Sequence, residues 1–126
     1  MKRFYCHCGQ EIFFDNTYCN SCNSILGFDP EQQKLISIEP YKGQFRSVLN
    51  PEKRYKRCEH HQHQMQCNWL LSTDDNFTQC LSCRLTRVIP NQIYPYNVKR
   101  WSVLEAAKRR MLYGLLRLGL PIDQWP

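Results

Sequence analysis

The stretch CEHHQHQMQCNWLLSTDDNFTQCLSC, residues 58–83, decides the fold of this chain. It holds four cysteines, and four more lie near the N-terminus, so all eight cysteines fall into two groups of four. The groups are Cys6, Cys8, Cys19 and Cys22, and then Cys58, Cys67, Cys80 and Cys83. A Cys-x-x-Cys turn presents two sulfurs from one short backbone segment, and a tetrahedral metal ion needs four donors that converge on one point. The sequence therefore predicts two structural zinc ions, each held by four cysteines.

The length of the chain, 126 residues, also favours metal binding. A unit of about 30 to 60 residues buries too little apolar surface to offset the loss of chain entropy, so it needs disulfides or a metal. Disulfides and an iron site of the rubredoxin type are the alternatives to zinc. The N-terminal segment MKRFYCHCGQ has no apolar run of signal-peptide length, and no segment approaches the ~20 apolar residues that span a bilayer. We therefore expect a cytoplasmic protein, in which paired cysteines bind metal rather than each other.

The first predicted unit, residues 1–28, has the order of turns and strands that a zinc ribbon requires. Gly9 follows a cysteine and permits the positive φ of a tight turn around a metal, and Asn23 is suited to the same left-handed position at the second turn. Residues 11–14 can form a short strand. His7 lies between two better ligands, so we interpret it as a solvated turn residue.

A predicted connector, residues 29–56, separates this unit from the second, residues 57–90. The connector has no cysteine and no strong hydrophobic period, although residues 35–38 can form a strand and residues 41–44 a turn. In the second unit, residues 67–71 suit a strand whose apolar side covers the metal site. Three histidines, any of which could replace Cys58 as a ligand, follow that cysteine: His60, His61 and His63.

The last predicted element is an amphipathic helix over residues 97–119. Its apolar residues recur at steps of three and four, which is the helical period. They are Trp101, Leu104, Ala107, Met111, Leu115 and Leu118, flanked by Leu112 and Leu116. Ser102 and Glu105 fit a capping box at the start of the helix, and Asn97 is the alternative N-terminal residue. Gly119 is a signal that ends the helix. The fold class is therefore a small, metal-stabilised α+β protein with two tandem zinc-ribbon-like units and one C-terminal helix.

Basic residues are concentrated in two places. The formal charge is +6, and the predicted helix carries six basic residues against one acid. Lys99, Arg110 and Arg117 share the helix side opposite the apolar stripe. The second concentration interleaves cations with an aromatic ring, as nucleic-acid binding would require, and comprises Lys53, Arg54, Tyr55, Lys56 and Arg57.

Four stretches of the chain resemble a known family. They are CHCGQEIFFDNTYCNSCNSILGFDP, CNWLL, CLSCRLTRVIP and WSVLEAAKRRMLYGLLRLGLP. They are similar to the N-terminal zinc-ribbon region of a bacterial family of zinc-binding metallopeptidases, in which a peptidase domain follows the cysteine-rich module. The resemblance implies metal roles for the cysteines of both groups. The peptidase signature H-E-x-x-H is absent from this sequence, so the chain is either an excised module or a protein that kept the module alone.

Three classes of function remain open from the sequence. The first is a non-catalytic zinc module that docks a protein partner, recruits a substrate or joins an attached peptidase domain. The second is a nucleic-acid-binding zinc ribbon that uses residues 53–57 and the basic side of the helix. The third, catalysis by these residues, is disfavoured because a site of four cysteines leaves no coordination position open for substrate.

Overall fold

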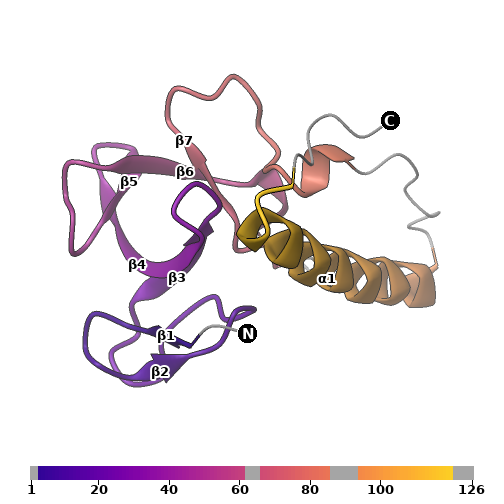
Figure 1. Ribbon diagram of the computed structural model, residues 1–126, viewed down its shortest axis with the longest axis horizontal. Helices are drawn as coiled ribbons and strands as arrows, with labels where there is room; N and C mark the ends of the chain where they lie inside the picture. The colour runs from indigo at the N-terminus through magenta and orange to yellow at the C-terminus, as the bar shows by residue number, and fades with distance from the viewer. Residues whose placement is uncertain (1–2, 62–65, 86–93, 121–126) are drawn as a thin grey trace.

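The computed structural model describes residues 3–61, 66–85 and 94–120. Two antiparallel sheets and one long helix build the molecule. The C-terminal end of the helix lies beside the sheets, and its N-terminal end extends away from them (Figure 1). The predicted α+β class, with antiparallel strands and a C-terminal helix, is confirmed.

The first sheet is a small hairpin inside the first cysteine group. Strand β1 (Phe4–Tyr5) pairs with β2 (Glu11–Ile12). Gly9 has a φ of +95° and Asn23 a φ of +63°, so both predicted left-handed positions are confirmed. Each closes a turn by donating its N–H to the carbonyl of a metal-site cysteine, Gly9 to Cys6 (2.9 Å) and Asn23 to Cys19 (2.8 Å).

The second sheet has five strands in the order of the chain and curls into a barrel-like ring (Figure 1). Its strands are β3 (Ile25–Asp29), β4 (Lys34–Tyr41), β5 (Gln44–Ser47), β6 (Arg54–Arg57) and β7 (Leu70–Ser72). Phe28 and Trp69 form a parallel bridge, and the Phe28 N–H donates to the Asn68 carbonyl (2.7 Å). The last strand is thereby brought back beside the first.

Residues 29–56 differ from the connector that the sequence suggests. They contain β4, β5 and most of β6, so this segment supplies the middle of the barrel. The strand expected at residues 35–38 and the turn expected at residues 41–44 are both present. β5 and β6 have only four residues each, and along β4 the buried residues Leu35, Ser37 and Ile38 do not alternate strictly with exposed ones, so no single window of sequence carries a strong period.

Gly27 lies inside the barrel, where it leaves room for a leucine. A Cβ at this position would lie 2.6 Å from Leu70 Cγ and 2.6–2.7 Å from its two Cδ atoms. Leu70 packs with Ile38 and Tyr55 in the barrel interior. Glycine is therefore required here by close packing, and not by an unusual backbone angle.

We expect Gly27→Ala to lower the free energy of unfolding by about 1–3 kcal/mol, because the extra methyl overpacks the interior. Urea denaturation would measure the loss. Gly114→Ala is the matched control, since its Cβ would meet nothing within 4 Å; in a helix it should stabilise by about 0.5–1 kcal/mol. Combining Gly27→Ala with Leu70→Ala should cost less than the sum of the two single changes, and strict additivity would contradict the packing argument.

The helix α1 (Pro95–Arg117) starts two residues earlier than expected and ends close to the predicted stop. Its N-cap is Tyr94, with no capping side chain, so Ser102 and Glu105 lie inside the helix and the predicted capping box is wrong. Proline in the first turn favours the start of the helix instead, because its fixed φ is a helical one. At the other end Gly119 has a φ of +76° and its N–H donates to the Leu116 carbonyl (3.0 Å), as in a Schellman motif.

The C-terminal half of α1 is fixed by Tyr113, which is buried among three rings. Its ring centroid lies 5.0 Å from that of Phe14, 5.6 Å from that of Phe28 and 6.0 Å from that of Phe4. Phe4 and Phe14 belong to the first unit and Phe28 to the barrel. The helix therefore holds these two parts together.

The buried side of α1 is rotated away from the predicted apolar stripe. The buried residues are Trp101, Glu105, Arg109, Leu112 and Tyr113. Leu104 and Met111, which the sequence places in the stripe, are 68% and 53% exposed. The pattern of apolar residues in the sequence does not reveal this rotation, because charged residues lie on the inner side of the helix. There, Lys108 Nζ pairs with Glu105 Oε2 at 2.9 Å.

Candidate metal centres

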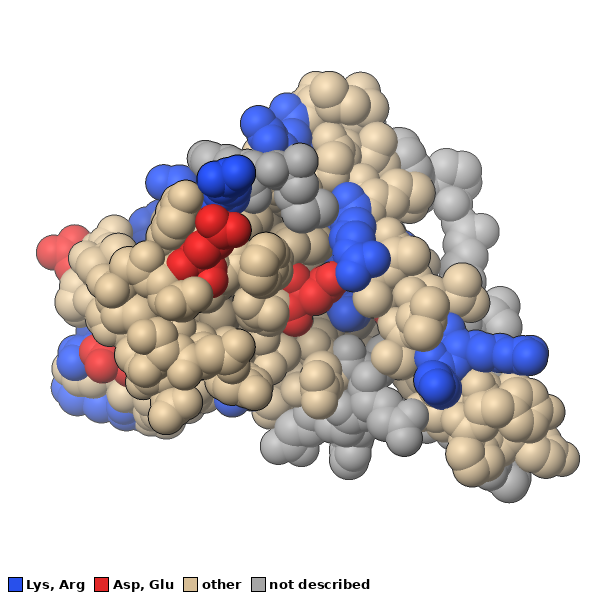
Figure 2. All heavy atoms as spheres, turned by 90° about the horizontal axis from the view of Figure 1, so that it is seen from below, with Lys and Arg blue, Asp and Glu red and all other residues tan. Residues whose placement is uncertain are grey.

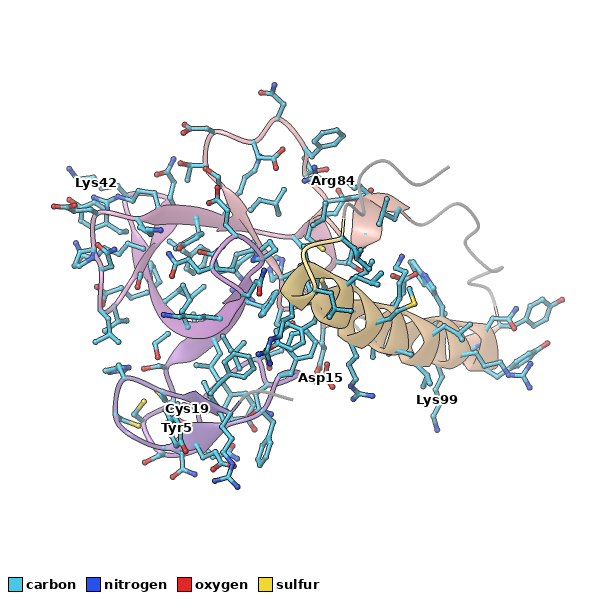
Figure 3. The ribbon with its side chains drawn as sticks, in the orientation of Figure 1. Tyr5, Asp15, Cys19, Lys42, Arg84 and Lys99 are labelled. Carbon is cyan, nitrogen blue, oxygen red and sulfur yellow. The ribbon has the colours of Figure 1, made fainter. Side chains whose placement is uncertain are left out.

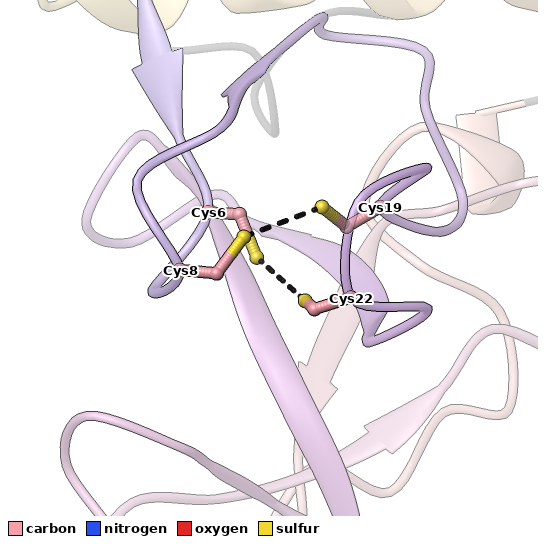
Figure 4. A group of neighbouring side chains, drawn as sticks. All are labelled: Cys6, Cys8, Cys19 and Cys22. Carbon is pink, nitrogen blue, oxygen red and sulfur yellow. Dashed lines mark hydrogen bonds between the residues drawn. The ribbon is translucent and has the colours of Figure 1, made fainter.

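The first cluster brings together the sulfurs of two tight turns. Cys6 Sγ lies 3.5 Å from Cys22 Sγ, and Cys8 Sγ lies 3.7 Å from Cys19 Sγ (Figure 4). All four sulfurs lie within 4.8 Å of one another. Cys6 and Cys19 are buried, whereas Cys8 and Cys22 are exposed. One side of this cluster therefore faces solvent.

The second cluster joins four cysteines that are all buried. Cys67 Sγ lies 3.5 Å from Cys80 Sγ and 3.8 Å from Cys83 Sγ, and all four sulfurs again lie within 4.8 Å. The Cys80 N–H donates to Cys58 Sγ (3.4 Å) and the Cys83 N–H to Cys80 Sγ (3.4 Å). Backbone donors of this kind stabilise thiolates, which are the form that binds a metal.

Both clusters have the dimensions that a tetrahedral zinc site requires. A Zn–S distance of about 2.3 Å places the sulfurs of a tetrahedron about 3.8 Å apart. The sulfur separations given above, 3.5–3.8 Å, agree with that value. A disulfide would bring two sulfurs to about 2.05 Å, so the cysteines are not bonded to each other. A bound Zn²⁺ supplies the positive charge that holds four thiolates together.

Neighbouring thiols shift each other's pKa values in opposite directions, and a bound cation would stabilise several thiolates at once. Hydrogen bonds from Cys67, Cys80 and Cys83 lower the pKa of Cys58, while the bond with Cys58 raises the pKa of Cys83. In the first cluster, hydrogen bonds with Ser24 lower the pKa of Cys22 to about 6. Several thiolates cannot share so small a volume without a cation, so the pattern fits a metal site.

The three histidines that the structure describes lie outside both sets of sulfurs. His61 Nδ1 lies 2.8 Å from the Cys58 carbonyl oxygen, and the His60 ring lies edge-on to Trp101 at a centroid distance of 5.7 Å. Neither belongs to the group of donors around Cys58. His7 is exposed at its turn. His63 lies outside the described residues, as does the part of the predicted second unit after Leu85.

The two metal sites share one core. Asn68, which follows the ligand Cys67, donates from Nδ2 to the carbonyls of Phe14 (2.8 Å) and Asn16 (2.9 Å) in the first unit. The next residue, Trp69, is completely buried, and its ring centroid lies 6.4 Å from that of Phe14. Sequence reasoning missed Asn68, because nothing in a Cys-Asn-Trp stretch shows where the amide points.

We expect a chelator to remove the two metal ions in two kinetic phases. The fast phase should come from the first cluster, because Cys8 and Cys22 are exposed whereas the second cluster is buried and must open first. A difference of only ~1.4 kcal/mol in opening free energy gives a tenfold ratio of rates. A colorimetric zinc indicator would follow the release. Cys22→Ser should remove the fast phase alone, and survival of that phase would contradict the assignment.

The basic run at residues 53–57 is not the surface that the sequence suggests. Tyr55 is buried inside the barrel and donates its hydroxyl to Asp29 Oδ2 (2.7 Å), so its ring cannot stack on a base. The Lys56 ammonium donates to the Asp75 carbonyl. Strand β6 alternates sides, and this alternation separates the cations of the run.

The sequence matches the zinc-ribbon domain family over residues 3–93, a range that contains both cysteine clusters. The chain belongs to the zinc-ribbon domain family. This membership and the sulfur geometry together make both clusters structural zinc sites, so the predicted cofactor, two zinc ions, is confirmed.

Similar sequences occur in mycobacteria. The chain is 34% identical to the uncharacterized protein Rv2568c of Mycobacterium tuberculosis and to the uncharacterized protein Mb2598c of Mycobacterium bovis, over 130 aligned residues. The alignments cover 100% of this chain and 35% of each relative, so the chain spans about a third of their length. No solved structure matches the chain. Within the described part of the zinc-ribbon chain, no helix is both long and apolar enough to cross a membrane.

Proposed function

We propose that this chain is a non-catalytic zinc-ribbon module that docks onto another protein domain. The carrying observation is the outer face of α1, formed by Val103, Leu104, Ala107 and Met111, all of which are exposed. A row of apolar side chains in water is unfavourable unless a partner covers it. In the mycobacterial relatives, the region outside the match is about twice as long as the matched region. We propose that a domain in that region is the partner.

The outer face has the form of a docking surface. Lys99, Arg100, Val103 and Leu104 line a shallow concavity of about 380 Å³ at its N-terminal end. The apolar residues lie between exposed cations, as in an interface with an apolar centre and a polar rim. A partner with an apolar patch bordered by carboxylates would complement it. The resemblance to the metallopeptidase family supports a peptidase-like domain in this role.

The absence of catalysis in this module is also part of the proposal. Each zinc is surrounded by four sulfurs, so no coordination position is left for water or a substrate. The zinc ions then serve to hold the ribbon that presents α1. Substrate recruitment would be an indirect effect of docking.

The proposal can be tested in full-length Rv2568c of Mycobacterium tuberculosis. Aspartate at the positions that align with Leu104 and Met111 should uncouple the module from the remainder of the protein. Calorimetry should then show two separate unfolding transitions in place of one, and limited proteolysis should cut between the parts. In the present chain the same changes should alter the free energy of unfolding by less than about 0.5 kcal/mol, because both side chains are exposed.

The matched control is aspartate at the position that aligns with Leu49, an exposed leucine on the barrel. It should leave the coupling between the parts unchanged. If the Leu49 control uncouples the protein to the same extent, or if neither change has an effect, the docking role of α1 is wrong.

A further inference from the structure

An unusual group of cations surrounds Tyr41 at the end of the barrel farthest from α1. The Arg46 guanidinium carbon lies 4.2 Å from the Tyr41 ring centroid, and that of Arg54 lies 4.4 Å from it. The Lys42 ammonium lies 5.2 Å from the same centroid. All three cations lie within the ~6 Å at which a positive charge is attracted to an aromatic ring.

The two arginines lie opposite each other in the sheet, and this placement has an electrostatic cost. Arg46 of β5 and Arg54 of β6 are direct partners in the sheet, and like charges in that position destabilise it. Their neighbours Phe45 and Tyr55 pack in the barrel interior, so both arginines are on its outer side. Glu39 neutralises Arg46 through a 2.7 Å ion pair. Among the described residues, Arg54 has no ion pair and its buried Nη1 has no hydrogen-bond partner.

We propose that Tyr41, Arg46 and Arg54 form a binding site for single-stranded nucleic acid. An arginine guanidinium presents paired donors that match the oxygens of a phosphodiester, and an anion there would relieve the repulsion between the two arginines. The guanidinium planes, which lie 4.2 and 4.4 Å from the Tyr41 ring centroid, also offer flat surfaces on which an unpaired base can stack. This site combines three strands and is independent of the docking function of α1.

The low net charge of the zinc-loaded molecule makes this local group of cations more important for binding a polyanion. Four thiolates and one Zn²⁺ carry a net charge of −2, so two occupied sites lower the formal charge of the chain from +6 to +2. A polyanion would therefore bind only where cations are concentrated. On the face shown in Figure 2, basic side chains are spread from one end of the molecule to the other, with a few acidic ones between them. Figure 3 places Lys42 at one extreme of the molecule and Lys99 at the other.

The test is a binding titration with a fluorescent oligothymidylate of about 12 nucleotides, the length that one small β-barrel covers. Fluorescence anisotropy would be measured at roughly 50 mM and 200 mM salt. We expect affinity that falls with salt. Tyr41→Ala and Arg54→Ala should each weaken binding about tenfold or more, and Arg54→Ala should reduce the slope of log affinity against log salt by about 0.7.

Two further variants test whether oligonucleotide binding depends on this site. Lys99→Ala, at the helix end, should leave the affinity within about twofold, and zinc content would confirm that each variant is folded. Arg54→Lys keeps the charge but loses the planar fork, and should bind with intermediate affinity. Absent binding, an equal loss in Lys99→Ala, or competition by inorganic tripolyphosphate as strong as that of the oligonucleotide would overturn the proposal.

Discussion

Cys80→Ser should unfold the second unit and release one of the two zinc ions. Cys80 is completely buried and contributes to the site both its sulfur and a backbone N–H that donates to Cys58 Sγ. Structural zinc contributes about 10–16 kcal/mol in small zinc-binding peptides, which equals or exceeds the stability of a typical domain. Elemental analysis should therefore fall from two zinc ions per chain to one. The fluorescence of Trp69, which is buried beside Cys67, should shift toward that of a solvated indole.

His61→Ala is the matched control for this change. The His61 ring is hydrogen bonded to the Cys58 carbonyl oxygen and is not one of the four sulfur ligands, so its removal should cost about 1 kcal/mol and leave both zinc ions bound. Two zinc ions retained in Cys80→Ser, or one lost in His61→Ala, would show that the ligands of the second site are assigned wrongly.

Tyr113→Ala should produce the second-largest effect, a loss of about 3–5 kcal/mol in the free energy of unfolding. The Tyr113 side chain is 2% exposed and touches aromatic rings of both the first unit and the barrel. Its truncation would leave a cavity where α1 is anchored. Chemical denaturation would measure the loss, and limited proteolysis should show earlier cleavage within α1.

Tyr96→Ala tests whether the effect belongs to the anchor rather than to any tyrosine of the helix. Tyr96 lies on the same helix but is 57% exposed, and its ring contacts are with Tyr94 and Arg100 on the surface. Its removal should change stability by less than about 0.5 kcal/mol. Comparable losses in the two variants would mean that α1 is not held through Tyr113.

The metal sites could be predicted from the sequence because their signal is local. A Cys-x-x-Cys turn and a left-handed residue such as Gly9 or Asn23 are separated by only a few positions, so spacing alone identifies them. The helix stop at Gly119 is local in the same sense. Each of these features depends on residues that are neighbours in the chain.

Features that depend on distant contacts could not be predicted in the same way. The barrel closes through Phe28 and Trp69, which are far apart in the chain. The orientation of α1 places Glu105 and Arg109 on the inner side, whereas hydrophobicity alone selects Leu104 and Met111 for it. The cations around Tyr41 come from β4, β5 and β6, and only the sheet register brings them together.

The amide of Asn68 has a practical consequence for dissecting the molecule. It is anchored to backbone carbonyls on the far side of the boundary between the two cysteine groups. Expressing either half by itself would leave those carbonyls and the indole of Trp69 uncovered, so neither half should be soluble. Gene fragments for biophysical work should span both groups and the helix.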